Sequence, residues 1–348
     1  METQFTYRRL EKVLNLEQTK SAILKAESEG RIPEARREPI GQSGRTQRVW
    51  DIADVPAIGE KYGFFKKLPE PKTVVVYTGK GGALKSTITL NLARVASLIS
   101  NTKTIVVGVD FQADISNALG LDISDDSMDD LSEIDEKINR VMGLFHLYSN
   151  ESVQLEDIIQ NTDIPTLDFI PETAELQLLE GSLHNEVKRE DWLNNNVIKP
   201  LRKMGYELII IDCPPSHNLM VTNALASLRE QDLLVSPLEA KIAHYRSHES
   251  QIKSLHKFKE KFEDFKECYI PTKYSGSKKL SNQIKRHYMN NVENCTTVGI
   301  KESIASEEAF ASYASLQEYK PNSVNGEEMR ELLIEINERF LQNKESLH

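Results

Sequence analysis

The amino-acid sequence predicts an α/β protein with a doubly wound parallel sheet, preceded by a small N-terminal domain. Three observations support this prediction. Strand-like segments alternate with helical ones from residue 73 onward, and a glycine-rich turn follows the first strand. A proline-punctuated segment, Pro69–Pro71, divides the chain. We therefore expect two domains, residues 1–67 and 68–348.

Six segments in the second part have the aliphatic, β-branched composition of buried strands. They are 73–77, 102–110, 166–171, 207–215, 233–239 and 266–272. Segment 86–100, after the first strand, is apolar at helical spacing. Strand, helix and strand within about 40 residues form a βαβ unit, and further alternation of this kind predicts a parallel sheet with helices on both faces.

The composition is that of a globular protein, because 39% of the 348 residues are hydrophobic and 28% are charged. No run of about 18 apolar residues exists, so we expect no membrane span. The N-terminus is mixed and charged, without the apolar centre of a signal peptide. Three scattered cysteines are typical of free thiols in a reducing compartment, which predicts a cytoplasmic protein.

Charge is distributed unevenly along the chain. The net charge is −10, but residues 1–67 have a balance of +3 and the remainder has −13. A basic module on an acidic body indicates different partners for the two parts. The acidic excess is concentrated in segment 122–136, which we expect to be a solvated loop or the start of a helix.

The glycine-rich turn spans residues 79–87, GKGGALKST. An ordinary phosphate loop has the pattern G-x-x-x-x-G-K-[ST]. Here Lys85 and Ser86 close the pattern, Leu84 replaces its last glycine, and Lys80 is a second lysine. Loop amides and the N-terminus of the next helix attract phosphate, Lys85 would reach the β- and γ-phosphates, and Ser86 would bind Mg²⁺. The expected nucleotide contacts are Gly79, Lys80, Gly81, Gly82, Ala83, Leu84, Lys85, Ser86 and, at the α-phosphate, Thr87.

Two carboxylates follow predicted strands. Asp212 lies at the carboxyl end of its strand, where α/β proteins bind ligands, and we expect it to hold Mg²⁺ through water together with Ser86. Asp110 follows the strand 102–110 and is a candidate for orienting or deprotonating the attacking water. The alternative for Asp110 is indirect ligation of Mg²⁺.

These motifs resemble those of the ParA/MinD family of P-loop ATPases. The pattern G-K-G-G-x-x-K-[ST]-[ST], the deviant Walker A motif, is matched by Gly79, Lys80, Gly81, Gly82, Lys85, Ser86 and Thr87. Segments 109–116, 168–180 and 206–226 are similar to those of ParA partition ATPases, and the resemblance covers about 73–340. The departures from the ParA pattern D-x-D-P-Q-x-N are Gly108, Phe111 and Asp114.

The resemblance implies a P-loop NTPase that uses ATP and Mg²⁺ and segregates DNA. It implies slow hydrolysis, stimulated by DNA and by a centromere-binding partner of the ParB type. It also implies an ATP-dependent homodimer, in which Lys80 reaches the phosphates held by the other subunit. Pro237, after the strand segment LLVS, would contact adenine. Such a protein binds DNA without sequence preference and is nucleoid-associated.

The first 67 residues lie outside this resemblance. Residues 5–14 and 16–31 each predict a helix, and Gly30 would end the second. The next segment, rich in proline, glycine and arginine, predicts a hairpin. Helix, helix and basic hairpin resemble a winged helix-turn-helix of the MerR type, as in long-form ParA proteins that repress their own operon. The candidate DNA contacts are Gln18, Thr19, Ser21 and Lys25 on bases and Arg36, Arg37, Arg45 and Arg48 on the wing. The alternative is a protein-docking appendage.

A second candidate DNA surface lies late in the chain, in segment 275–288. Its cations are Lys278, Lys279, Lys285 and Arg286, and the alternative is a solvated charged face.

The sequence bears on three functions other than partition. A nucleotide-sensing repressor without a partition role stays open. A membrane-site placement ATPase of the MinD type would need a basic amphipathic C-terminal helix, whereas segment 329–343 is amphipathic but acidic and predicts a helix packed on the body. A reductase like the nitrogenase iron protein would need cysteines placed for a shared cluster, and the scattered cysteines do not suit it.

Overall fold

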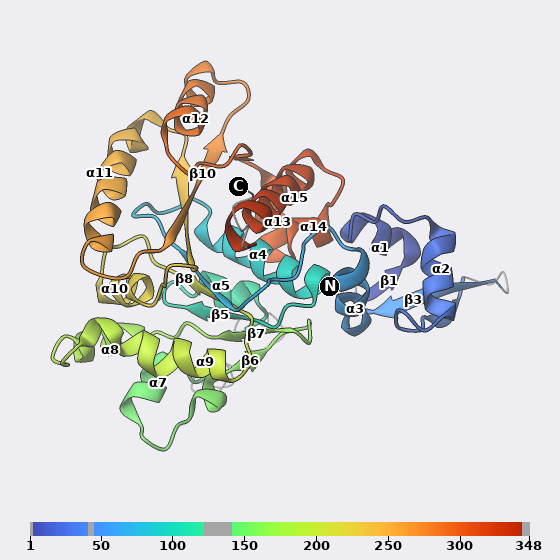
Figure 1. Ribbon diagram of the computed structural model, residues 1–348, viewed down its shortest axis with the longest axis horizontal. Helices are drawn as coiled ribbons and strands as arrows, with labels where there is room; N and C mark the ends of the chain where they lie inside the picture. The colour runs from blue at the N-terminus through green and yellow to red at the C-terminus, as the bar shows by residue number, and fades with distance from the viewer. Residues whose placement is uncertain (1–2, 41–44, 122–140, 343–348) are drawn as a thin grey trace, which may run out of the picture.

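The computed structural model describes residues 3–40, 45–121 and 141–342. The acidic segment 122–136 therefore lies outside the described residues. The described residues form two sheets, a small one near the N-terminus and a large one in the body (Figure 1).

The N-terminal region contains two helices followed by a hairpin. Its strands form an antiparallel sheet in the order β1-β3-β2. The elements are β1 (Gln4–Thr6), α1 (Tyr7–Val13), α2 (Lys20–Ser28), β2 (Arg36–Pro39), β3 (Thr46–Asp51) and α3 (Val55–Tyr62). The two helices and the hairpin are thus confirmed as elements, while their assignment to a winged helix-turn-helix stays a prediction.

The second helix begins later than the sequence indicated. The Thr19 hydroxyl accepts a hydrogen bond from the Ala22 amide at 3.4 Å, so Thr19 is the N-cap and Lys20 is the first helical residue. A threonine side chain that bonds to a nearby amide favours the cap over the helix interior. Gln18 and Thr19 therefore precede α2, whereas Ser21 and Lys25 lie within it and are exposed.

The N-terminal region is packed directly on the body. Helix α3 lies against α4 (Lys85–Ser100), and a Cβ on Gly59 would come within 2.7 Å of the carbonyl oxygens of Leu98 and Ile99. On another side, the Gln317 amide donates to the carbonyls of Lys12 and Val13 at 3.0 and 2.9 Å. Residues of both regions share one hydrophobic core. The division at residues 67 and 68 stays a prediction.

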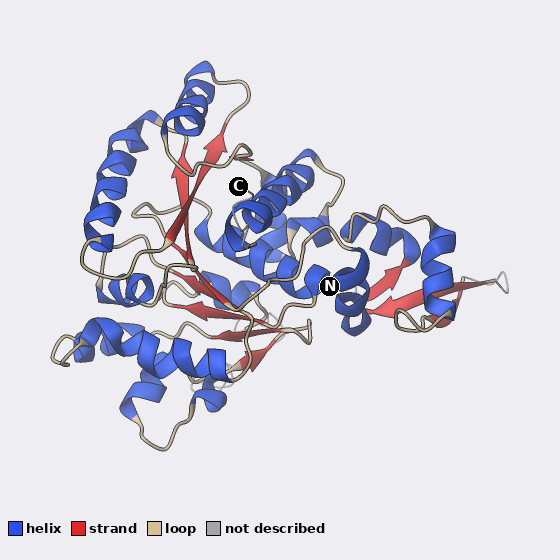
Figure 2. Ribbon diagram, in the orientation of Figure 1, coloured by secondary structure: helices blue, strands red, loops and turns tan. Residues whose placement is uncertain are grey.

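The body is built on an eight-stranded sheet in the order β11-β10-β9-β4-β8-β5-β7-β6 (Figure 2). All neighbouring strands are parallel except β6 and β7. The strands are β4 (Lys72–Val76), β5 (Thr104–Gly108), β6 (Gln160–Asn161), β7 (Leu167–Ile170), β8 (Leu208–Asp212), β9 (Leu233–Glu239), β10 (Lys266–Tyr274) and β11 (Ile300–Lys301). All six expected strands are confirmed, and the short β6 and β11 extend the two edges.

Helices cover both faces of this sheet, as predicted. Side chains of one strand alternate between the two faces, so Val74 and Val76 of β4 pack in one core while Val75 packs in the other. The helices are α4, α5 (Asp114–Ala118), α7 (Leu144–Ser149), α8 (Leu176–Leu183), α9 (Lys199–Lys203), α10 (Leu219–Ala226), α11 (Ile242–Lys259), α12 (Lys279–Asn291), α13 (Ile304–Ala311), α14 (Leu316–Tyr319) and α15 (Val324–Ile336).

The last helix is packed on the body, which confirms the expectation for segment 329–343 as far as residue 342. Met329, Leu332, Leu333 and Ile336 of α15 are buried in the core shared with α4. Among the described residues, no helix combines the length and apolar character needed to cross a bilayer.

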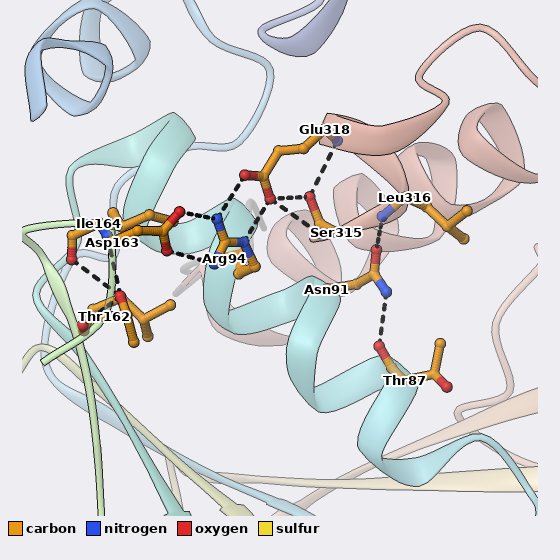
Figure 3. Close-up of polar contacts among 10 residues, drawn as sticks. Thr87, Asn91, Arg94, Thr162, Asp163, Ile164, Ser315, Leu316 and Glu318 are labelled. Atoms are coloured by element: carbon orange, nitrogen blue, oxygen red, sulfur yellow. Dashed lines mark hydrogen bonds and ion pairs between the residues drawn. The ribbon is translucent and has the colours of Figure 1, made fainter. Parts of the chain in front are cut away.

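A buried ion-pair network joins α4 to the C-terminal part of the body (Figure 3). The Arg94 guanidinium donates to both carboxylate oxygens of Glu318, at 2.7 and 2.8 Å, and to Asp163 at 2.8 and 3.0 Å. Burial alone would raise the pKa of Glu318, but the Arg94 charge lowers it below its ordinary value. The helix that starts at the phosphate loop is thereby fixed to α14, beside the Gln317 contact with α1.

Candidate phosphate-binding site

The glycine-rich turn connects β4 to the N-terminus of α4, as predicted. Two of its residues are left-handed, Gly82 with φ of 69° and Leu84 with φ of 71°. Leu84 stands where an ordinary phosphate loop has its last glycine, and that conformation costs a residue with a Cβ roughly 1–2 kcal/mol. The Leu84 side chain packs against the core, which offsets this cost. The position therefore has the glycine-type backbone although its residue is leucine.

The two lysines of the turn are placed differently. Lys85 is 7% exposed, and its Nζ donates to the Lys80 carbonyl at 3.4 Å. The Lys85 ammonium group therefore lies against the backbone of the loop, where a lysine of this motif would contact phosphate. Lys80 is partly exposed at the other side of the turn. It borders a cavity of about 780 Å³ whose other lining residues include Gly79 and residues of α11.

The metal-site prediction joins two residues that are 126 positions apart. The Ser86 hydroxyl donates to Asp212 Oδ2 at 2.7 Å. Thr89, one turn further along α4, donates to Oδ1 at 2.6 Å. Asp212 is fully buried, and burial raises its pKa to about 6, while the two hydroxyl groups and Lys85 act to lower it. Such a carboxylate–hydroxyl pair is suited to Mg²⁺ held through water.

Asp110 lies on the adjacent strand end, two residues beyond β5. It is 8% exposed, and its carboxylate accepts the Gln112 amide at 3.1 Å. Burial raises the pKa of Asp114, with Asp110 adding to the rise and Lys85 opposing it. Asp110, Asp114 and Lys85 therefore share one electrostatic environment. The water-orienting role of Asp110 stays a prediction.

Four further residues of the site were not anticipated from the sequence. Gln251 of α11 accepts hydrogen bonds from the Gly79 amide at 2.8 Å and the Thr78 hydroxyl at 3.1 Å. Lys273, at the end of β10, has its Nζ 3.8 Å from where a Cβ on Gly82 would lie. The others are Thr89 and Glu172. Glutamine and lysine have no strand-end or loop signature in a single sequence, whereas Glu172 follows the Ile-Pro end of β7 and could have been noticed.

Glu172 is a buried residue whose carboxyl group contacts the backbone of Asp110. It is 3% exposed and accepts the Asp110 amide at 3.3 Å. Burial raises its pKa well above the ordinary value, and the Asp212 charge adds to this rise. Asp110, Glu172 and Asp212 therefore bring carboxyl groups together from the ends of β5, β7 and β8.

Pro237 lies inside β9, whose bounds match the predicted strand 233–239, and not after a strand that ends with the segment LLVS. It is buried and paired in register with Ile270 of β10. β4 pairs with β9 only from Leu233 to Val235, so on that side Pro237 lies past the paired residues, where a missing N–H interrupts no pairing. Its contact with adenine stays a prediction.

The candidate DNA-contacting arginines of the hairpin differ in their surroundings. Arg48 forms an ion pair with Glu27 of α2 at 2.7 Å and is only 28% exposed. Arg36 is paired with Asp51, while Arg37 and Arg45 are exposed. Arg48 therefore connects the hairpin to α2 and is less available to phosphate than Arg37.

The exposed cations of the second basic surface differ from the predicted set. Lys278 and Lys279 are exposed at the start of α12, and Arg286 is exposed in the middle of this helix. The Lys285 Nζ lies 3.8 Å from the centre of the Tyr274 ring, and burial lowers its pKa. Lys285 is thus part of the packing between α12 and β10, and the exposed set contains three cations.

The family of the chain follows from its match to a family model. Residues 71–266, more than half of the chain, match a family described as an AAA domain (AAA_31). The chain belongs to this family.

Two curated relatives are similar to parts of this chain. The chromosome partitioning protein ParA of Myxococcus xanthus is 30% identical over 169 residues, which are 48% of this chain and 52% of that protein. The sporulation initiation inhibitor protein Soj of Bacillus subtilis is 28% identical over 168 residues, 48% of this chain and 58% of that protein. The chain thus spans little more than half the length of these relatives.

Solved structures show the same fold. A McdA–ATP complex from Cyanothece has a TM-score of 0.62 at 19% identity, covering 76% of this chain and 96% of that one. A putative plasmid partition protein of Borrelia burgdorferi bound to AMPPNP has 0.57 at 20%, covering 77% and 98%. Cobyrinic acid a,c-diamide synthase of Mycobacterium smegmatis, with an ATP analog and magnesium, has 0.54 at 18%, covering 71% and 92%.

Proposed function

We propose that this protein is a DNA-partition ATPase that hydrolyses ATP with Mg²⁺. The observation that carries the proposal is the Asp212 carboxylate, which accepts hydrogen bonds from Ser86 and Thr89 at the start of the helix that follows the glycine-rich turn. The names and ligands of the relatives support it. In the proposed complex, Ser86 would bind the metal ion and Asp212 would bind its water, while Lys85 would neutralise phosphate charge.

Hydrolysis is proposed to be slow and coupled to dimerisation. Asp110 would orient the attacking water beside the metal ion. Lys80, partly exposed and outside the Lys85 pocket, would reach the phosphates held by a second copy of the chain. A lysine supplied by the partner makes phosphoryl transfer depend on the dimer, because this reaction depends on charge neutralisation and positioning. ATP would then act both as substrate and as part of the interface.

The two parts of the chain would contact DNA in different ways. The dimer would bind DNA of any sequence through Lys278, Lys279 and Arg286. Residues 1–67 would form a winged helix-turn-helix domain that recognises an operator and represses the operon, with Ser21 and Lys25 of α2 as base contacts and Arg37 and Arg45 as phosphate contacts. A ParB-type protein would stimulate hydrolysis, and the protein would be cytoplasmic and nucleoid-associated.

The proposal is tested by binding of the protein to random-sequence duplex DNA, measured by fluorescence anisotropy with ATP, ADP or no nucleotide. We expect tight binding only with ATP, and loss of that binding in Lys80→Ala. Lys203→Ala is the matched control, because Lys203 is an exposed lysine of α9. Binding that is indifferent to nucleotide and to Lys80 would contradict the partition mechanism and favour a nucleotide-sensing repressor.

A further inference from the structure

A side chain at the end of β5 would overlap the Glu172 side chain, which follows the end of β7. Gly108 is the last residue of β5, and a Cβ placed on it would lie 2.1 Å from Cγ of Glu172 and 2.6 Å from its Cδ. Glu172 belongs to the segment that leaves β7, two residues after Ile170. Atoms in a packed interior do not approach so closely. A side chain at position 108 and the present placement of Glu172 therefore exclude each other.

The Glu172 carboxylate connects three pieces of chain. Its Oε1 accepts the Asp110 amide at 3.3 Å, and its Oε2 accepts the amide and the hydroxyl of Ser116 at 3.4 and 3.3 Å. In return, Ser116 Oγ accepts the Glu172 amide at 2.7 Å. The bonds fix the segment after β5 and the helix α5 to the end of β7. The amide held by Oε1 belongs to the residue proposed to orient water.

Placing a carboxyl group here has a cost that a smaller residue would avoid. Glu172 is 3% exposed, and the carboxylates of Asp110 and Asp212 lie close enough to act on it. A buried polar group is tolerated when its hydrogen bonds are made. The contacts of Glu172 with Asp110 and Ser116 supply those bonds, which an alanine at the same place could not make.

We propose that Glu172 is the positioning residue for Asp110, and that position 108 is a glycine because Glu172 occupies its side-chain space. The inference rests on the proposed ATPase function, since the position of Asp110 matters only if Asp110 acts in hydrolysis. Glu172 accepts a hydrogen bond from the backbone amide of Asp110 and so keeps the Asp110 side chain beside Lys85 and Asp212. Glu172 acts through Asp110 and does not itself touch the nucleotide.

The pair suggests a rescue experiment. Glu172 Oε1 lies 2.8 Å from the Cβ position at residue 108, close to the distance from Cβ to a carboxylate oxygen within an aspartate. The double variant Gly108→Asp/Glu172→Ala would therefore return a carboxylate to the same volume from the other strand. Gly108→Asp alone would meet the Glu172 side chain, and Glu172→Ala alone would leave the Asp110 and Ser116 amides without their acceptor.

Steady-state ATP hydrolysis is measured for the wild type, the two single variants and the double variant, with thermal unfolding of each. We expect Glu172→Ala to lower kcat about 10- to 100-fold, as for a displaced catalytic group, while KM changes less than about threefold. We expect the double variant to regain at least about tenfold in kcat over Glu172→Ala. If Gly108→Asp does not fold, recovery of both folding and kcat in the double variant still supports the exchange of space.

Asp168→Asn is the matched control. Asp168 is a buried carboxylate on β7, bonded to Asn161 and Tyr206, and its replacement should lower the unfolding temperature with little effect on kcat. Two results would overturn the inference about Glu172 while leaving the proposed function intact. One is a Glu172→Ala variant with the kcat of the wild type. The other is a double variant whose kcat is no higher than the losses of the two single variants, multiplied together, would give. A wild type that neither binds a fluorescent ATP analogue nor hydrolyses ATP would overturn the proposed function and the inference with it.

Discussion

The phosphate-loop region and the candidate DNA-contacting surfaces are built in opposite ways. At the loop, Lys85, Asp212 and Glu172 are buried, and each bonds to a residue from another part of the fold or loop. On the DNA-contacting surfaces, Arg37 and Lys279 are exposed. Buried polar groups must be paired, whereas exposed charges interact weakly and are screened by salt. Changes at the loop should therefore be large and specific, and changes at the surfaces small, additive and dependent on salt.

The largest effect is expected at Asp212. Asp212→Ala removes the acceptor of the Ser86 and Thr89 hydroxyls and the carboxylate proposed to hold Mg²⁺ through water. We expect kcat for ATP hydrolysis to fall about 100- to 1,000-fold, measured over a Mg²⁺ titration. Thr89→Val is the control, because it leaves the Ser86 bond in place, and its loss should stay within about tenfold. A Mg²⁺-dependent turnover within threefold of wild type in Asp212→Ala would argue against this site.

The next effect concerns stability and tests whether burial is decisive away from the loop. Arg94→Ala would leave Glu318, which is 2% exposed, without its counter-charge, and we expect unfolding in urea to require roughly 3–5 kcal/mol less free energy. The double variant Arg94→Met/Glu318→Gln should be less affected, because it removes the two buried charges and leaves only Asp163, which is 31% exposed, without its partner. Lys320→Ala, which breaks an exposed pair with Glu308, is the surface control and should change little. Equal losses of unfolding free energy in Arg94→Ala and Lys320→Ala would contradict the difference expected between buried and exposed ion pairs.

A pH effect is expected at His248, a 1%-exposed histidine whose Nε2 accepts the Glu239 amide at 3.1 Å. Burial lowers the pKa of His248 to about 4, with His244 and Lys80 adding to the fall and Glu239 opposing it. Since the folded-state pKa lies below the ordinary 6.5, the neutral ring stabilises the fold above pH 6.5. This contribution, up to about 3 kcal/mol, is lost as the pH falls from 6.5 toward 4.

The measurement is the difference in unfolding free energy between wild type and His248→Gln, from urea titrations at several pH values. Using the difference removes the contributions of the carboxyl groups that titrate in the same range. We expect the wild type to lose its advantage as the pH falls below 6.5. A difference that stays constant from pH 7.5 to pH 4.5 would show that this histidine is not held neutral.

The smallest effect is expected at the surface of α12. Replacing Lys278, Lys279 and Arg286 together by alanine should weaken ATP-dependent binding to random DNA about tenfold at moderate salt and reduce the salt slope by up to about three. Lys285→Ala is the control from the same segment, because its ammonium group lies over Tyr274. If Lys285→Ala weakened DNA binding as much as the triple variant, Lys285 would have to contact DNA like the three exposed cations, contrary to its packing over Tyr274.

The fold was predictable because its elements have strong local signals. The aliphatic runs of β4, β5 and β8 and the apolar periodicity of α4 specify buried elements, and all of them are present. The glycine-rich turn fixed the phosphate site, and the strand-end aspartates followed from the parallel sheet. The start of α2 was missed because the hydrogen bond of the Thr19 cap decides where that helix begins.

By itself, the sequence determined which residues form the phosphate loop and which strands end beside it, since glycine, lysine and aliphatic runs act locally. Only the tertiary structure decided the partners of those residues. Thr89 bonds Asp212, Glu172 occupies the side-chain space of Gly108, and Lys285 packs over Tyr274, because the fold brings distant parts of the chain together. Such contacts depend on the close packing of side chains in three dimensions, which no local pattern in the sequence encodes.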